Sequence, residues 1–511
     1  MLKKKRIDKK IEVPSLPEPF KPMFKMGSKN FQPFPNDIIY NFYAECDEKV
    51  YRDITNKPFL SEEDTNDVLA NCTTINIISP TSTFKTTGAV KLLGYGSRLY
   101  KKLSWSVKLD NKFLGRKSFK LRAMANDPTL VREKLATELY RAVGVPVQEG
   151  AYARVFINGD VYGLYTLCDS LSNKWIANYI HGDNKAKIGY SYKLISSHPE
   201  GPYADLKYIG DDYNAYIEKN TYEVDEYDKT AVKATDLAGQ WKPLIEFTKK
   251  YDNWVKTYGN DNSEQAINEL KKFFNIESVL RTMAIDTLIL GLDNFWLVMS
   301  NAQLYYNLER QNYQILPYDF DESLSGDKDD SLIDNEHYMD DCITWVNHRD
   351  DIFDHYFTNN LMKHPQIKER YDVILGKVTR EVFTKDTVSS YIHSVADLIK
   401  DDVKWNFEAI DKLNIGYEDG NVNHFTYEEF ESNLDYTPVD WNGDINNDDA
   451  PFGILEWVEK RGDSCRKYTN KVDITKNVNI SDDVDLESAA NPKAVYSILL
   501  FTILYVFYFA L

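Results

Sequence analysis

The sequence predicts an α+β protein with a strand-rich first half and a helix-rich second half. Short strand patterns dominate between about residues 39 and 170, and long helical patterns of apolar residues dominate from about 235 to 410. Hydrophobic residues make up 43% of the 511 residues and aromatic residues 14%, which is ample for a packed core. A chain of this length holds one large domain or two to three ordinary ones.

The composition also limits the partners. The chain has 61 Lys and Arg against 79 Asp and Glu, and the formal net charge of −18 argues against a nucleic-acid-binding surface. The five cysteines show no metal-ligand spacing, so one or two disulfides remain open and their pairing cannot be derived from the spacing. These cysteines are Cys46, Cys72, Cys168, Cys342 and Cys465.

Changes in composition divide the chain into six parts. They are an extended basic and proline-rich arm (1–40), a strand-rich part (41–170), a polar insert rich in Tyr and Asp (171–234), a helical part with a polar hairpin (235–410), an Asn- and Asp-rich region (411–487) and an apolar tail (488–511). We expect the insert to cover a cleft or to face a partner.

The first half contains several strand patterns separated by turns. The clearest are Thr74–Ile78, Ser104–Leu109 and Phe119–Arg122. Gly94 and Gly96 lie in a turn before the second of these strands, where backbone N–H groups can face a phosphate. The alternative is that this segment is an ordinary turn.

A helix and a hairpin follow these strands. Asp127 is suited to cap the helix and Pro128 to its first position. The helix carries Glu133, which could orient a lysine of the neighbouring strands toward a phosphate. The alternative, which we favour for any single charge of this helix, is an ordinary amphipathic helix with solvated charges. Residues 151–157 and 161–167 form a strong hairpin pattern around the turn Asn158-Gly159-Asp160.

The second half predicts helices over residues 235–258 and 263–290, two more between 352 and 399, and a short one over 456–468. Residues 414–449, rich in Asn and Asp, predict loops.

The stretch from residue 286 to 326 is the strongest candidate for a site. A buried helix ends before Asp293, two strands follow over 304–306 and 313–316, and Asp319 comes directly after them. We expect Asp293, Asn301 and Asp319 to meet at the ends of this hairpin. One carboxylate would accept a proton from an attacking hydroxyl, while a carboxylate and an amide oxygen hold Mg²⁺ against phosphates. The alternative is that they are turn residues that only stabilise the hairpin.

The two ends of the chain point to processing. Small residues at Ser488-Ala489-Ala490, a short spacer and an apolar run to Leu511 are typical of a GPI-anchor signal, with Ser488 as the attachment site and a tail-anchored helix as the alternative. The basic start has no apolar region after it and is not a secretory signal, so we expect the natural N-terminus to lie upstream. Asn71 and Asn479 begin N-glycosylation triplets.

An ordered set of motifs resembles the CotH family, which is named for a bacterial spore-coat protein and is similar to atypical protein kinases. The matching segments are Leu121-Arg122, Asp127, Val131-Arg132-Glu133-Lys134-Leu135-Ala136, Ile157-Asn158-Gly159, Tyr162-Gly163-Leu164-Tyr165, Asp293 and Pro317-Tyr318-Asp319-Phe320-Asp321. The resemblance covers about residues 71–400.

The resemblance implies a two-lobed kinase-like fold that uses ATP and Mg²⁺, with Mn²⁺ as the alternative metal, to phosphorylate Ser and Thr of partner proteins and of itself. It implies Asp293 as the catalytic aspartate and Asn301, Asp319 and Asp321 as metal ligands.

The nucleotide-binding lysine stays open between Lys108 and Lys120. We prefer Lys108 slightly because it follows the glycine turn. Asp169 stands where the family usually has a glutamate.

The resemblance leaves two hypotheses of different classes. The first is an active kinase at the cell surface or in the secretory pathway. The second is a surface adhesin with vestigial or absent catalysis, since CotH-like proteins with GPI tails are also known as surface invasins of mucoralean fungi that bind host receptors. Two short triplets are treated as chance matches: His348-Arg349-Asp350 follows Asp319 in the wrong order for a kinase, and Arg461-Gly462-Asp463 lies in a predicted helix where it cannot project as a loop.

Overall fold

Seven strands of the first half close into a barrel in the order β1-β2-β3-β4-β5-β7-β6. They are β1 (Ile39–Cys46), β2 (Ala70–Ile78), β3 (Thr83–Leu92), β4 (Trp105–Phe113), β5 (Arg116–Arg122), β6 (Gly150–Ile157) and β7 (Asp160–Asp169). Closure comes from a parallel pairing of β1 with β6, since the other neighbouring strands are antiparallel. The sequence predicted the strands and the α+β class but not the barrel.

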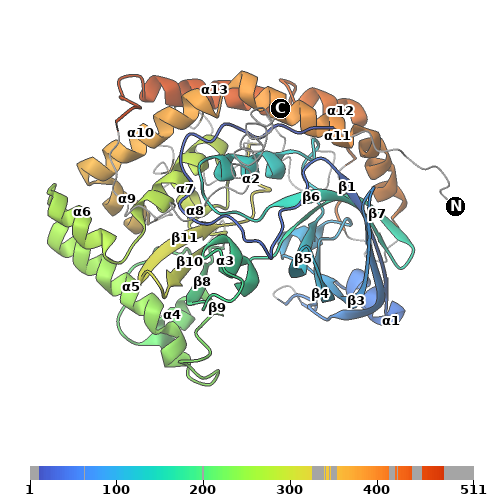
Figure 1. Cartoon of the computed structure of the whole chain (residues 1–511), viewed down its shortest axis with the longest axis horizontal. Coiled ribbons are helices and arrows are strands. Elements are labelled where there is room, and N and C mark those ends of the chain that lie inside the picture. The colour runs from blue at the N-terminus through green and yellow to red at the C-terminus, as the bar shows by residue number, and fades with distance from the viewer. Residues whose placement is uncertain are drawn as a thin grey trace, which may run out of the picture.

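This computed structural model describes residues 11–61, 64–197, 201–324, 339, 341–343, 346, 354–413, 420–422, 424–439 and 452–476. Figure 1 shows the barrel at the lower right, with the C-terminal helices along the top.

Alternating side chains fill the barrel. Trp105, Val107 and Leu109 on β4 are buried, while Lys108 between them is exposed. Phe119 and Leu121 on β5 are also fully buried in the same core. This period of two is the strand pattern predicted from the sequence.

The predicted hairpin is present as β6 and β7. Its turn places Asn158 at φ 50° and Gly159 at φ 84°, the left-handed conformations that an Asn-Gly hairpin turn needs. The Asn158 side chain accepts a hydrogen bond from the Cys46 backbone N–H at 2.7 Å and so ties the turn to the end of β1. Helix α11 (Lys385–Lys412) packs against β7.

The second sheet has the order β11-β10-β8-β9. Its strands are β8 (Tyr190–Leu194), β9 (Tyr222–Glu226), β10 (Ala302–Asn307) and β11 (Asn312–Pro317). The predicted insert therefore supplies two strands that extend the hairpin β10–β11 into a sheet. It also contains helices α3 (Asn173–Tyr179) and α4 (Tyr213–Lys219).

Helices form most of the second half. Besides α1 (Glu48–Asn56) and α2 (Arg132–Ala142) in the first half, they are α5 (Leu237–Tyr258), α6 (Glu264–Lys271), α7 (Ile276–Ile289), α8 (Phe295–Val298), α9 (Tyr356–Met362), α10 (Pro365–Glu381), α11, α12 (Tyr427–Asn433) and α13 (Ile454–Tyr468). Every residue of α7 is buried, as expected for a helix inside a large core.

The predicted helix over residues 263–290 is two helices. Between α6 and α7 the backbone pairs with β11: the Tyr313 N–H donates to the Phe273 carbonyl at 2.8 Å, and the Asn275 N–H donates to the Tyr313 carbonyl at 2.9 Å. Asn275 then caps α7 through its side chain. The tertiary pairing thus overrides a continuous helical pattern.

Two further differences concern the C-terminal third. The described part of residues 352–399 contains parts of three helices rather than two, because α9 precedes α10. Helix α12 lies in a region predicted as loops, and a capping box between Thr426 and Glu429 begins it.

The described part of the N-terminal arm is extended, as predicted, but it is packed against the helices. The Leu16 N–H donates to Glu138 of α2 at 3.1 Å, and Arg281 of α7 donates to the Lys21 carbonyl at 2.8 Å. Buried apolar side chains of the arm include Val13, Leu16, Met23, Phe24, Phe31 and Phe34.

Two disulfides are present, Cys46–Cys72 and Cys342–Cys465. Cys168 is a buried free thiol, and burial raises its pKa to about 12. In the parts of the chain that the structure describes, no helix is both long and apolar enough to cross a membrane.

Replacing Cys342 and Cys465 by Ala should lower the free energy of unfolding by about 2–5 kcal/mol, because that bond closes a loop between residues 123 positions apart. Denaturant unfolding measures this loss. The matched control is the double Ala variant of Cys46 and Cys72, which lie 26 positions apart. Its loss should be smaller by about 1 kcal/mol, and a larger loss for the short-range bond would contradict the chain-entropy account.

Candidate functional site

Arg122, the last residue of β5, collects three carboxyl groups. Its guanidinium forms a bidentate pair with Asp319, in which Nη1 donates to Oδ2 at 2.8 Å and Nη2 donates to Oδ1. Nη2 also lies 2.9 Å from an oxygen of Asp321, and Nε lies 2.6 Å from Oε1 of Glu133. One cation thus joins the barrel, helix α2 and the loop after β11.

The fold explains these positions. Leu121 points into the barrel, so Arg122 must point outward toward α2. Glu133 lies in the first turn of α2, where the helix dipole favours an acidic side chain. Asp319 has φ 64°, a left-handed conformation that turns the chain away from β11 and toward Arg122.

Asp293 and Asn301 form the second half of the site. The Asn301 side-chain amide donates to the Asp293 carboxylate, and the Asn301 carbonyl accepts from the Tyr318 N–H at 2.8 Å. The Asn294 amide donates to the carbonyl of Asp319 at 3.1 Å. The three residues predicted to converge are therefore joined through hydrogen bonds at the base of the hairpin.

Within the described part of the chain, the surroundings of the Asp293 carboxyl group leave one of its oxygens unpaired and raise its pKa. Its Oδ1 is buried and has no hydrogen-bond partner among the described residues. Burial, followed by the negative charges of Glu322 and Asp319, raises the pKa of Asp293 well above its usual range. An acceptor oxygen in this state is suited to take up a proton or a cation.

The pKa values of the remaining carboxyl groups are shifted in different directions. Burial and then Asp319 raise the pKa of Asp321 well above the usual value, and burial raises that of Glu133. Burial would also raise the pKa of Asp319, but Arg122 and then Lys120 outweigh it and hold that pKa below the usual value. Carboxyl groups therefore outnumber the two cations that act on them, and their raised pKa values show that ionising all of them together is unfavourable.

The structure brings Lys120 to the carboxyl groups. Lys120 lies two residues before Arg122 on the same face of β5, with its Nζ 5.7 Å from the centre of the Tyr318 ring. Lys108, which the sequence slightly favoured, is exposed on β4 opposite Ala89 and Ser118.

The expected partner of Glu133 also differs. We expected it to orient a lysine, whereas its ion-pair partner is Arg122. The signal for Arg122 was its place at the end of a strand, two positions after a lysine, on the face opposite to the apolar residues.

Some polar groups of the glycine turn are hydrogen-bonded within the turn. The Gly94 carbonyl accepts from Arg98 Nε at 2.6 Å, and Gly96 begins a short 3₁₀ helix, η1 (Gly96–Leu99). Gly94 has φ 73°, and a Cβ there would lie 2.6 Å from the Ser97 hydroxyl oxygen, so the turn favours glycine. Because Leu92 pairs with Trp105 and Trp105 with Leu121, the turn lies at the same end of the barrel as Arg122.

The other residues singled out in the sequence lie elsewhere. Asn71 is exposed on β2 beside the Cys46–Cys72 disulfide. Asn479, Ser488 and the triplet at 348–350 lie outside the described residues.

The Arg461 triplet and Asp169 have structural partners instead. Arg461 lies in helix α13, as predicted, where it is also fully buried and donates to the Thr287 carbonyl at 2.7 Å. Asp169 forms a buried ion pair with Arg116, and burial raises its pKa to about 6 despite that arginine.

The donor set suits a hard divalent cation. Asp293 offers a buried oxygen without a partner, and carboxylate and amide oxygens are the ligands that Mg²⁺ prefers. A divalent ion would also favour the ionised forms of these carboxyl groups. Within the described ranges, no three His, Cys, Asp or Glu side chains already stand in a metal-holding arrangement, because Asp319 and Asp321 are directed at Arg122. The residues therefore fit the ion by chemistry, and Asp319 would have to share its oxygens with it.

A barrel, a helical half and an acidic cluster joining them define this chain as an α+β protein with an anionic, cation-compatible site. The sequence model of a family described as CotH kinase protein matches residues 90–464. The chain belongs to this family. The match begins later than the resemblance found in the sequence but extends further toward the C-terminus, through α12 and into α13.

Three relatives come from the fungus Rhizopus delemar. Spore coat protein homolog 1 is 23% identical over 367 residues, which cover 71% of this chain and 54% of the relative. Invasin CotH2 is 23% identical, covering 72% of this chain and 57% of the relative, and Invasin CotH3 is 22% identical, covering 72% and 56%. The matched part of this chain spans just over half the length of these relatives.

The raised pKa of Asp293 carries a prediction about stability. When the pKa of a carboxyl group is higher in the folded than in the unfolded chain, the folded protein becomes less stable as the pH rises from the unfolded pKa through the folded pKa. Asp293→Asn should therefore be more stable than the wild type at pH 7, by an amount of order 1 kcal/mol, and the difference should vanish below about pH 4. Thermal unfolding as a function of pH measures it, with Asp110→Asn, an exposed position on β4, as the control. A variant less stable than the wild type at pH 7 would contradict this account.

Proposed function

We propose that this chain is a protein kinase of the CotH type, which uses Mg²⁺ and ATP to phosphorylate Ser and Thr of partner proteins and of itself. The observation that carries the proposal is the convergence of Asp293, Asn301 and Asp319 beside Arg122 and Lys120. Phosphoryl transfer needs this combination of a base, oxygen ligands for a metal and cations that face phosphates.

Each residue has a role in this proposal. Asp293 accepts the proton of the attacking hydroxyl through Oδ1, the oxygen without a partner. Asn301 and Asp319 hold the divalent ion, with Asp321 beside them, and Mn²⁺ is the alternative metal. When bound, the ion neutralises charge on the phosphates and orients them.

The barrel contributes the basic groups. Arg122 and Lys120 face the phosphates, and Glu133 holds Arg122 in place at 2.6 Å. The Gly94–Gly96 turn lies at the same end of the barrel and is the candidate for further phosphate contacts. Arg122 belongs to the barrel and Asp319 to the other half of the chain, so the site lies at their junction. This arrangement supports a two-lobed kinase-like fold with the barrel and α2 as the first lobe.

We further propose that the protein acts at the cell surface or in the secretory pathway. Two disulfides are typical of an oxidising compartment. Asn71 is exposed and accessible to glycosylation, and a GPI anchor at Ser488 would provide the contact with the membrane. The names of the relatives, spore coat protein homolog and invasin, agree with this location.

A second candidate function is a surface adhesin that binds a host receptor, with vestigial or absent catalysis. The invasin names of two relatives favour it. The buried side chain of Arg461 argues that such binding would not use the Arg461-Gly462-Asp463 triplet. The two functions are not exclusive.

Autophosphorylation tests the first function. Purified wild type incubated with Mg-ATP should incorporate phosphate, whereas Asp293→Asn and Asp319→Ala should lose at least about 100-fold in rate. Two lysine variants serve as a matched pair. Lys120→Ala should lose activity because it removes a cation beside Asp319, and Lys108→Ala should not. If no variant and no wild type incorporates phosphate while all bind host cells equally, the adhesin remains.

Nucleotide binding can be measured apart from catalysis. A non-hydrolysable Mg-ATP analogue at 100 times its Kd should stabilise the folded wild type by about 2.7 kcal/mol and raise its melting temperature. Asp319→Ala should show no shift, since it removes a ligand of the ion. An unchanged melting temperature of the wild type with the analogue would contradict ATP binding.

A further inference from the structure

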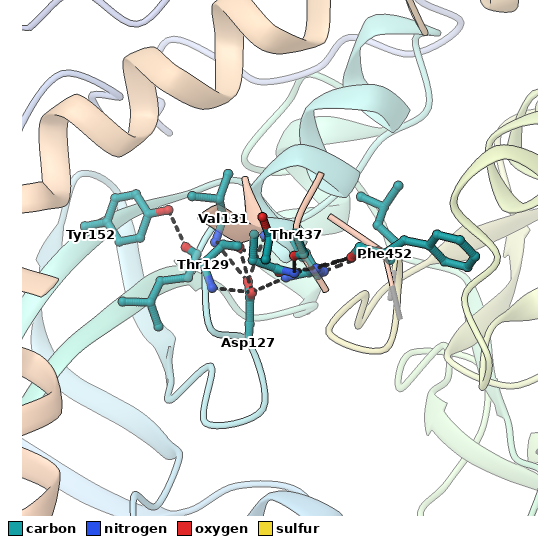
Figure 2. A network of polar contacts seen from close by, with 10 residues as sticks. Asp127, Thr129, Val131, Tyr152, Thr437 and Phe452 are labelled. Atoms are coloured by element: carbon teal, nitrogen blue, oxygen red, sulfur yellow. Dashed lines mark hydrogen bonds and ion pairs between the residues drawn. The ribbon is translucent and has the colours of Figure 1, made fainter. Parts of the chain in front are cut away.

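Arg132 is buried directly behind the acidic site. It precedes Glu133 in the first turn of α2, but its side chain is 2% exposed and donates to Asp127 and Asn433. Figure 2 shows the polar network around Asp127 to which these contacts belong. Glu133 faces Arg122, whereas Arg132 contacts segments from both halves of the chain. Neither residue type nor local pattern indicated this role in the sequence.

Five acceptors surround the Arg132 guanidinium, and one of them is the Thr129 hydroxyl, which accepts from Nη1 at 3.4 Å. Nη1 lies 2.8 Å from the Asp127 carboxylate, and Nε donates to the Leu324 carbonyl at 3.3 Å. Nη2 donates to the Asn433 side-chain oxygen at 2.6 Å and to the Phe452 carbonyl at 3.4 Å. A buried arginine with one carboxylate partner depends on such neutral acceptors for its remaining N–H groups.

Asp127 connects this arginine to the start of α2. Its carboxylate accepts from the backbone N–H groups of Thr129, Val131 and Arg132, each at 2.9 Å. The sequence predicts that Asp127 caps a helix that begins at Pro128. The helix instead begins at Arg132, and Asp127 reaches over the intervening loop to satisfy its first N–H groups.

Leu324 connects Arg132 to the loop after β11 that carries Asp319 and Asp321. It lies three residues after Asp321, and its own N–H donates to the Ile289 carbonyl of α7 at 2.8 Å. Arg132 therefore fixes the far end of the loop whose near end carries Asp319 and Asp321. Helix α2 and this loop are joined twice, at the front by Arg122 and at the back by Arg132.

Asn433 connects both to the C-terminal segment. It is fully buried at the end of α12, and its amide nitrogen donates to the Thr437 carbonyl at 2.8 Å and to the Phe452 carbonyl at 3.4 Å. Figure 2 shows Thr437 and Phe452 approaching the start of α2 from the side opposite to Tyr152.

We propose that Arg132 and Asn433 are positioning residues of the acidic site: through Arg132, Asn433 of α12 and the Phe452 carbonyl set the separation between Glu133 and the Asp319–Asp321 loop. The proposal rests on the proposed function in assigning a nucleotide and a metal to that site. The mechanical coupling rests only on the contacts above. Loss of the Asn433 acceptor would leave a buried N–H group unpaired and release both α2 and the loop.

Asn433→Leu and Asn433→Asp test the proposal. Leucine is similar in size and removes both the acceptor and the donor, whereas aspartate keeps an oxygen for Arg132 and removes only the donor to Thr437 and Phe452. The control is Asn178→Leu, which changes a fully buried asparagine in α3 that donates to the Lys174 carbonyl. Hydrogen exchange at residues 130–140 and 319–324 is the first readout, and the affinity of the wild type and variants for a Mg-ATP analogue is the second.

We expect Asn433→Leu to speed exchange in both segments by about tenfold and to weaken Mg-ATP binding by about tenfold. Both effects should be smaller in Asn433→Asp, which keeps the acceptor for Arg132 but loses the N–H groups that donate to the Thr437 and Phe452 carbonyls. The control variant should change neither. Unchanged exchange in Asn433→Leu overturns the coupling. Faster exchange with unchanged affinity overturns the positioning role. Failure of the wild type to bind the analogue overturns the proposed function and the positioning role together, while the exchange result still decides the coupling.

Discussion

The ion pairs of Arg122 are the interaction on which the rest of the site depends. Arg122 is the last residue of a barrel strand, and its three carboxyl partners belong to a helix and a loop outside the barrel. Removing such a cluster of charges from water is unfavourable. The attraction between the ions offsets this desolvation only when the partners are well placed. Its geometry therefore fixes how the strand-rich and helix-rich halves of the chain meet.

The same cluster remains unbalanced in charge. Asp293, Asp321 and Glu133 have raised pKa values because burial and neighbouring carboxyl groups act in the same direction. Such a site reduces stability in the absence of a ligand and is common where a protein binds cations or transfers protons. The buried core of α7 and the network of Arg132 provide the rigid surroundings in which this unfavourable arrangement persists.

Local sequence patterns predicted much of this structure, but they did not predict the pairing of strands that lie far apart in the sequence. The hairpin β6–β7 and the meeting of Asp293, Asn301 and Asp319 follow from turn chemistry and from strands that end in polar residues. Barrel closure requires β1 to pair in parallel with β6, more than a hundred residues later, and no local pattern encodes it. The role of Arg122 was missed because a lysine was expected, and α2 was placed too early because Asp127 reaches over a loop to cap it.

The network behind the site has a consequence for the order in which the protein is made. The acceptor that Asn433 provides to Arg132 lies 301 residues downstream in the chain. Domains commonly begin to fold while they emerge from the ribosome, starting at the N-terminus. The barrel has all its strands early in synthesis, but the acidic cluster can take its final form only after α12 and Phe452 have emerged. A nascent chain that lacks α12 could therefore have a folded barrel while its acidic cluster is still incomplete.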